Sequence, residues 1–178
     1  MKLLDLKLSF EPLEHDALYE EIAQEYKFLG NHRPKMRLLT VTEKEDHNLP
    51  ENFCEELADM LPALSYQLCT NHDKKSFAKH LKEEEHDLPH VLEHIIIGIF
   101  MMVKNDYYQG ITLGTAEKAE IIVTYLNQIV AKKSAYLALD VLNSLIRGQK
   151  IDLIEAVKEI TGGRVLIWRK PTSLVDSH

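Results

Sequence analysis

The chain has 178 residues, of which 45% are hydrophobic and 28% charged, so it can bury a proper core and is neither a disordered nor a fibrous protein. Its formal net charge of −7 and isoelectric point near 5.7 argue against a nucleic-acid partner. Asp5 and Lys7 interrupt the apolar start of the chain, and the longest apolar run, Ile95 to Val103, is too short to cross a bilayer. We therefore expect neither a signal peptide nor a membrane partner. Nine histidines stand against two cysteines, Cys54 and Cys69, without a CxxC pair, which indicates a reduced, cytoplasmic protein.

The hydrophobic pattern predicts one α+β domain, in which a small antiparallel or mixed sheet packs against several helices, one of them long. Alternating leucines predict a strand over 2–10, four-residue spacing predicts a helix over 16–28, and β-branched residues predict a second strand over 36–42. A helix then begins at Leu49-Pro50 and ends near Pro62, and a short polar helix follows over 76–85. The most apolar helix extends from Leu88 to about Val103, with Asp87 as its N-cap.

The second half of the chain predicts a β-hairpin, two helices and a last strand. The hairpin has strands over 107–113 and 120–125, around Gly110 and Gly114. A long helix extends from Asn127 to Arg147, with an inner face of Ile129, Ala135, Leu139, Leu142 and Ile146. Asp152 caps a further helix to about residue 160, and a last strand is expected over 164–169. The domain is thus expected to span 1–170, with a loose tail over 171–178.

One motif has a residue spacing that suits metal binding. Residues 90–94 read His-Val-Leu-Glu-His, the HxxEH order of the inverted zincins. On a helix His90 and His94 lie one turn apart on one face, so both imidazoles can reach a single zinc ion. Glu93 would lie beside the metal, where it can accept a proton from water and deliver it to a leaving amine. The alternative is a polar helix face with solvated histidines, and the other seven histidines are interpreted as incidental.

A catalytic zinc site with two histidines usually has a carboxylate as its third protein ligand. The sequence offers Glu117 and Glu120 near the hairpin and Glu155 on the late helix, and each can equally be a surface carboxylate. We take Glu120 as the predicted third ligand, with the other two left open.

The surroundings of the motif resemble the N-terminal domain of cyanophycin synthetases. The matching features, in order, are Leu61-Pro62-Ala63-Leu64, Cys69, Phe77, the 90–94 motif, the strand at 121–125, the helix around 135–139 and Asp152-Leu153, covering roughly residues 34–160. The resemblance implies a zinc-metallopeptidase-like site that cuts a polymer of aspartate with arginine attached through side-chain amides. It also implies that His90 and His94 hold the metal and that Glu93 is the general base. The ATP-grasp and Mur-ligase-like domains of the synthetases are absent from this sequence.

The chain departs from this resemblance at two places. It has Ile97-Gly98-Ile99 where the family tends to have an acidic residue, and Thr124 where the family places a glutamate. Our leading hypothesis is a zinc-dependent peptidase-like domain acting on a peptide or cyanophycin-like polymer, with a homodimer as the expected assembly. The alternative is a polymer-binding or protein-interaction module of the same fold without catalysis. A third hypothesis is a regulatory subunit whose histidines sense pH.

Overall fold

The computed structural model describes residues 3–9, 34–42, 49–69, 76–83, 87–104, 106, 108–115 and 118–166. The predicted helix over 16–28, Glu117 and the predicted tail over 171–178 lie outside these residues.

Four antiparallel strands form a sheet in the order β1-β2-β4-β3. Their bounds are β1 (Leu3–Ser9), β2 (Lys35–Thr42), β3 (Gly110–Gly114) and β4 (Lys118–Thr124). In the register of β2 against β4, Met36 is opposite Val123 and Leu38 is opposite Ile121, and all four side chains are fully buried. Because alternate residues of a strand face the same side, these pairs mark the face of the sheet that carries the core. The predicted small sheet is confirmed, and it is antiparallel.

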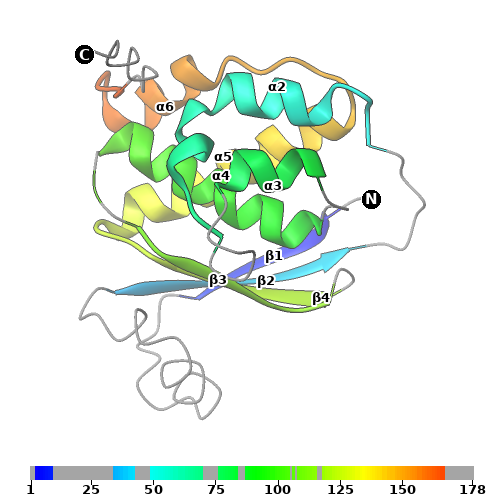
Figure 1. The fold of residues 1–178 in the computed structure, drawn as a ribbon. Helices are drawn as coiled ribbons and strands as arrows, with labels where there is room; N and C mark the ends of the chain where they lie inside the picture. The colour runs from blue at the N-terminus through cyan, green and yellow to red at the C-terminus, as the bar shows by residue number, and fades with distance from the viewer. Residues whose placement is uncertain are drawn as a thin grey trace, which may run out of the picture.

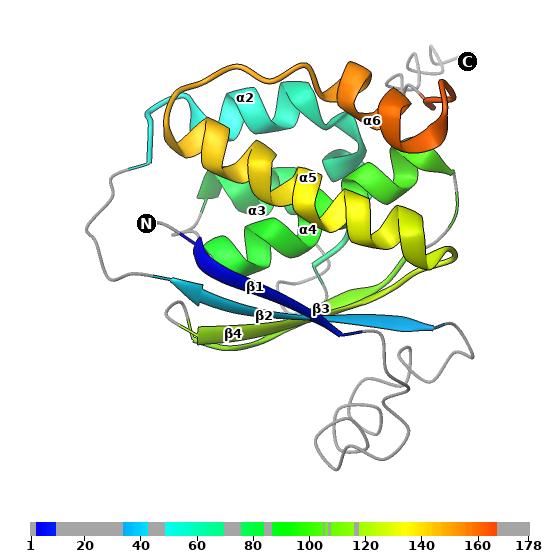
Figure 2. The same cartoon turned by 180° about the vertical axis from the view of Figure 1, so that it is seen from behind.

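The helices lie on this one face of the sheet (Figures 1 and 2). The described residues form α2 (Phe53–Met60), the 3₁₀ helix η2 (Pro62–Tyr66), α3 (Phe77–Glu83), α4 (Leu88–Val103), α5 (Gln128–Ile146) and α6 (Leu153–Thr161). Helix α4 contacts β3 and β4 on one side and α5 on the other, which places it at the centre of the α+β domain. The predicted α+β class with one long helix is confirmed.

The position of α4 explains its composition. Leu92, Ile95, Ile96 and Ile99 are fully buried, so its apolar run is core. No helix in the described part of the chain is long and apolar enough to cross a membrane. Asp87 occupies the N-cap position as predicted, but its side chain makes no capping hydrogen bond.

Three details differ from the sequence predictions. Strand β3 begins at Gly110, so Tyr108 and Gln109 lie outside the strand although the prediction over 107–113 included them. In α5, Ile129 is 69% exposed, and the buried face consists of Ala131, Ser134, Ala135, Leu137, Ala138, Val141, Leu142 and Leu145. Residues 164–166 form no strand, because the backbone N–H of Leu166 donates to the carbonyl of Met102 near the end of α4 rather than to a sheet edge. The remainder of that predicted strand lies outside the described residues.

Candidate metal centre

Helix α4 brings His90 and His94 together on one face, as their spacing predicts. Their Nε2 atoms are 3.1 Å apart and their ring centroids 4.8 Å apart. Both Nε2 atoms point into the same small volume, so the two imidazoles can share one cation.

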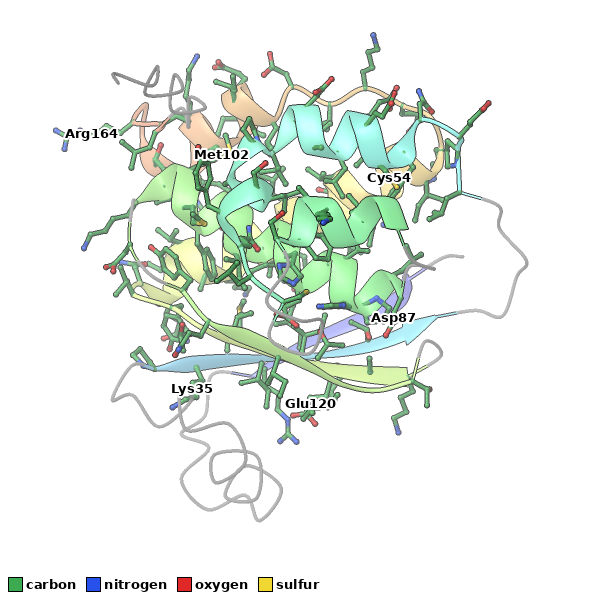
Figure 3. The ribbon with its side chains drawn as sticks, viewed as in Figure 1. Lys35, Cys54, Asp87, Met102, Glu120 and Arg164 are labelled. Atoms are coloured by element: carbon green, nitrogen blue, oxygen red, sulfur yellow. The ribbon has the colours of Figure 1, made fainter. Side chains whose placement is uncertain are left out.

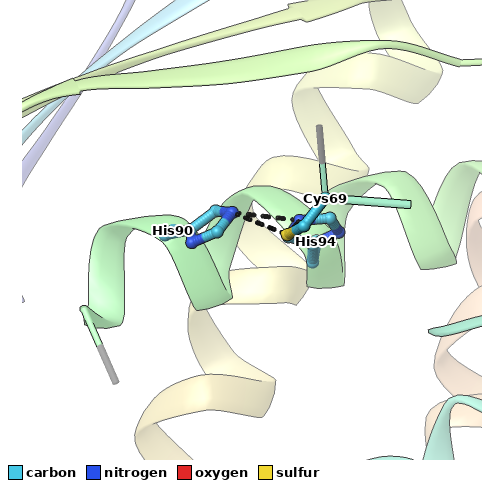
Figure 4. Close-up of side chains that lie close together, drawn as sticks. All are labelled: Cys69, His90 and His94. Atoms are coloured by element: carbon cyan, nitrogen blue, oxygen red, sulfur yellow. Dashed lines mark hydrogen bonds between the residues drawn. The ribbon is translucent and has the colours of Figure 1, made fainter. Parts of the chain in front are cut away.

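A third donor comes from the segment that follows η2. The Sγ atom of Cys69 lies 3.4 Å from Nε2 of His90 and 3.3 Å from Nε2 of His94 (Figure 4). A backbone hydrogen bond from the N–H of Phe77 to the carbonyl of Gln67 joins this segment to the start of α3. The segment before Cys69 is therefore held by α3 while its thiol faces α4.

The separations of the three donor atoms are close to those of ligands around one tetrahedral metal ion. With Zn–N bonds of about 2.05 Å and a Zn–S bond of about 2.3 Å, the edges of the tetrahedron are roughly 3.3–3.6 Å, close to the three separations above. Cys69 and His94 are buried and His90 is half-buried. Three lone-pair donors facing one another are mutually repulsive unless a proton or a cation lies between them. Cys69, His90 and His94 thus form a group that could hold a metal ion.

Two further side chains, those of Phe77 and Gln67, contact the ring of His94. The ring of Phe77 stacks on the imidazole at 3.7 Å with an interplanar angle of 11°, and it meets His90 edge-on at 5.5 Å. The Oε1 atom of Gln67 lies 2.6 Å from Nδ1 of His94, and Nε2 of Gln67 donates to the carbonyl of His94 at 3.1 Å.

Glu93 is buried on the same turn of α4. Thr112 of β3 donates a hydrogen bond of 2.6 Å from its hydroxyl to Oε2 of Glu93. Burial raises the pKa of Glu93 to about 7, and the hydrogen bond from Thr112 opposes this rise. Gly110, also on β3, packs so closely that a Cβ there would lie 2.8 Å from the Glu93 side chain. The carboxyl group is therefore fixed between α4 and the edge strand.

Glu93 and His94 both line a cavity of about 220 Å³. Its other lining residues come from the η2 end, from α4 and from the segment that enters β3: Tyr66, Gln67, Leu68, Ile97, Met101, Asp106, Tyr108, Gln109 and Gly110. Tyr66 is 38% exposed and Leu68 61%, so the cavity has an apolar, open rim beside the donor group. A buried carboxyl group, an imidazole and a space for a ligand thus lie together.

The structure does not place the predicted third ligand with the histidines. Glu120 lies on the face of the sheet away from the helices, where it forms a salt bridge with Arg37 of β2 (Figure 3). Glu155 is exposed on α6 and accepts a hydrogen bond from Lys158, and Glu117 lies outside the described residues. Among the described side chains, the third donor is the thiol of Cys69 rather than a carboxylate.

The sequence contained one signal for Cys69. It stands among the features that resemble cyanophycin synthetases, between the proline-bearing helix and Phe77, but no pairing rule singled it out as a ligand. Cys54 and Cys69 are not joined in a disulfide, and the thiol of Cys54 donates to the carbonyl of Leu81.

Thr124, which stands where the resemblance places a glutamate, has a structural role. Its Oγ1 accepts a hydrogen bond from the N–H of Gln109 at 3.0 Å and donates to the carbonyl of the same residue at 3.3 Å. Thr124 therefore anchors the segment that leads from the cavity into β3.

Comparison with known proteins supports the family that the sequence features suggest. No curated protein matches the chain. The family model described as "cyanophycin synthase-like N-terminal domain" matches residues 35–147, a range that includes β2, the donor group, Glu93, the β3–β4 hairpin and the long helix α5. The chain therefore belongs to the family of cyanophycin synthase-like N-terminal domains.

Proposed function

We propose that this protein is a metal-dependent hydrolase of amide bonds, in which Cys69, His90 and His94 hold zinc and Glu93 transfers the proton. The observation that carries the proposal is the shared cavity. Glu93 and His94 line one ligand-sized space, and His94 belongs to the three-donor group. Carbonyl hydrolysis needs an electrophile and a proton acceptor next to the same substrate.

Each residue has a separate task in this proposal. A zinc ion held by the donor group supplies Lewis acidity, which polarises an amide carbonyl and acidifies water. Glu93 accepts the proton of the attacking water and delivers it to the leaving amine, and a pKa of about 7 suits both steps near neutral pH. Thr112 holds one carboxyl oxygen in place, which leaves the other for the substrate. The apolar surroundings of α4 strengthen these interactions because they exclude water.

The lining of the cavity suits a cationic polymer. It contains two carboxyl groups, Glu93 and Asp106, and two tyrosines, Tyr66 and Tyr108, and none of the described residues that line it is lysine or arginine. Asp106 also forms a salt bridge with Lys104, whose ammonium nitrogen is 3.8 Å from its carboxylate. Carboxylates and aromatic rings attract guanidinium groups. We therefore propose an arginine-bearing aspartyl polymer of the cyanophycin type as the substrate.

The test is metal analysis combined with hydrolysis of such a polymer. We expect one zinc per chain, chelator-sensitive release of smaller fragments, and a loss of about 10²- to 10⁴-fold in rate for Glu93→Gln with zinc retained. Cys69→Ser should lose the zinc, whereas the matched variant Cys54→Ser should keep it. Absence of stoichiometric zinc, or unchanged hydrolysis by Glu93→Gln, would refute the proposal.

One observation favours a second candidate, a polymer-binding module without catalysis. The described donor group contains no carboxylate, and Thr124 occupies the place where the resemblance expects a glutamate. Such a module would bind the polymer without any chelator-sensitive cleavage. Binding measured on the same preparation as hydrolysis separates the two candidates.

A further inference from the structure

The geometry points to Gln67 as a positioning residue that fixes the tautomer of His94 and thereby makes its Nε2 a metal donor. Gln67 lines the cavity but is not one of the three donors, and both ends of its amide contact His94, so it acts on the metal site through the His94 ring. This inference rests on the metal site of the proposed function but not on the hydrolysis.

The orientation of the Gln67 amide follows from its two contacts. The backbone carbonyl of His94 can only accept a hydrogen bond, so the NH₂ end of the amide must face it, at 3.1 Å. The oxygen end must then face Nδ1 of His94, at 2.6 Å. An amide oxygen can only accept, so Nδ1 has to carry the proton.

A proton on Nδ1 leaves a lone pair on Nε2 in the neutral ring. That lone pair faces Sγ of Cys69 and Nε2 of His90, which are 3.3 and 3.1 Å away. Metal-binding histidines in proteins commonly donate their second N–H to a carbonyl or carboxylate, and loss of such a partner weakens metal binding. Gln67 fills this role here with a neutral amide.

The surrounding structure holds Gln67 in place. Gln67 is 6% exposed, and its carbonyl accepts from the N–H of Phe77, the residue whose ring stacks on His94. A Cβ at Gly98 would lie 3.3 Å from Nε2 of Gln67, so the glycine admits the amide against α4. Gly98 lies in the stretch where the sequence departs from the acidic residue of the family.

The first experiment uses the unaltered chain. Metal-free protein labelled with ¹⁵N-histidine is studied by NMR at pH 8, with the His94 signals assigned by their loss in His94→Ala. We expect the His94 ring proton on Nδ1 alone. A proton on Nε2 overturns the proposal, and this result does not depend on whether the protein hydrolyses anything.

The second experiment measures zinc affinity by competition with a chromophoric chelator. Gln67→Leu should weaken zinc binding by about 10- to 100-fold. Gln67→Glu keeps an acceptor facing Nδ1 but loses the donor to the His94 carbonyl, so it should weaken zinc binding less than Gln67→Leu does. Gln109→Leu is the matched control, since it removes another buried glutamine that lines the same cavity, and it should leave zinc affinity unchanged. Unaltered affinity in Gln67→Leu, or an equal loss in Gln67→Glu, overturns the proposal. If Gln67→Leu does not fold, the NMR result decides.

Discussion

The close approach of Gly110 to Glu93 gives a prediction with a definite magnitude. The backbone of Gly110 does not have a positive φ, so alanine is compatible with its conformation. The new Cβ would nevertheless lie 2.8 Å from both Cγ and Oε1 of Glu93, and 3.0 Å from its Cδ. Glu93 is buried and held by Thr112, so it cannot swing into solvent. We expect Gly110→Ala to displace the carboxyl group at a cost of about 1–3 kcal/mol.

A double-mutant cycle isolates this contact. In a Glu93→Ala background the new methyl group meets empty space, so Gly110→Ala should be near neutral there, or stabilising by up to about 1 kcal/mol through the lower entropy of the unfolded chain. The coupling between the two sites should be about 1–3 kcal/mol. Gly98→Ala is the matched control, since its Cβ would meet Leu61 and Gln67 instead of Glu93. It should combine additively with Glu93→Ala to within about 0.5 kcal/mol.

The assay is urea unfolding of the metal-free proteins, followed by circular dichroism, with the midpoint and slope fitted for each variant. In thermal unfolding, 1 kcal/mol corresponds to about 2–4 °C for a chain of this size. An equal cost of Gly110→Ala in both backgrounds would show that the steric reasoning is wrong. The hydrolysis rate of Gly110→Ala should also fall while zinc affinity is kept, because the change moves the base and not the donors.

Three further predictions concern the charges of the site. The pKa of Glu93 is about 7 in the folded protein against an ordinary 4.5, so between these pH values the folded metal-free protein binds a proton that the unfolded chain has lost. Its free energy of unfolding should therefore fall by about 3 kcal/mol as the pH rises from 4.5 to 7. In Glu93→Gln this part of the pH dependence of the urea midpoint should disappear. Thr112→Val removes the hydrogen bond that lowers this pKa, so the ¹³C titration of the Glu93 carboxyl should shift to higher pH, and an unshifted curve would contradict the role of Thr112. Glu120→Gln should leave zinc affinity unchanged, since the carboxylate pairs with Arg37; a tenfold loss would restore Glu120 as a ligand.

The sequence was sufficient to predict those features that depend on a single helix. The spacing of His90 and His94 fixes their common face on any helix, and the apolar run with Pro89 near its start made that helix recognisable. Asn127 and Asp152 precede helices and accept hydrogen bonds from the first-turn N–H groups, as residues of their type do.

The side of the sheet on which Glu120 lies was harder to predict. Alternation along β4 puts Ile121 and Val123 toward the helices, so Glu120 faces the other way. Ile122 hides this alternation in the sequence because it is also apolar, and it is only 2% exposed in the structure. Three consecutive apolar residues carry no information about which face is inside.

Cys69 could not be predicted from spacing because its approach to α4 is a tertiary event. It lies 21 residues before His90, and the intervening chain includes α3. The backbone hydrogen bond from Phe77 to Gln67 joins the segment before Cys69 to α3, and no local sequence pattern predicts that contact. Sequence reasoning therefore expected a carboxylate, the usual third ligand, and the structure provides a thiol.

A thiol in the place of the expected carboxylate should change which metal ions the site prefers, and this preference can be measured. Two imidazoles and one thiolate suit zinc and cobalt, whereas magnesium and manganese prefer oxygen donors. We expect millimolar Mg²⁺ or Mn²⁺ to leave bound zinc in place. Co²⁺ should enter the zinc-free protein and show a thiolate-to-cobalt charge-transfer band that Cys69→Ser abolishes and Cys54→Ser retains. A cobalt-loaded Cys69→Ser protein that keeps this band, or displacement of zinc by Mn²⁺, would mean that Cys69 is not a ligand. The third donor would then be sought among the carboxylates, which are the usual third ligand of zinc sites with two histidines.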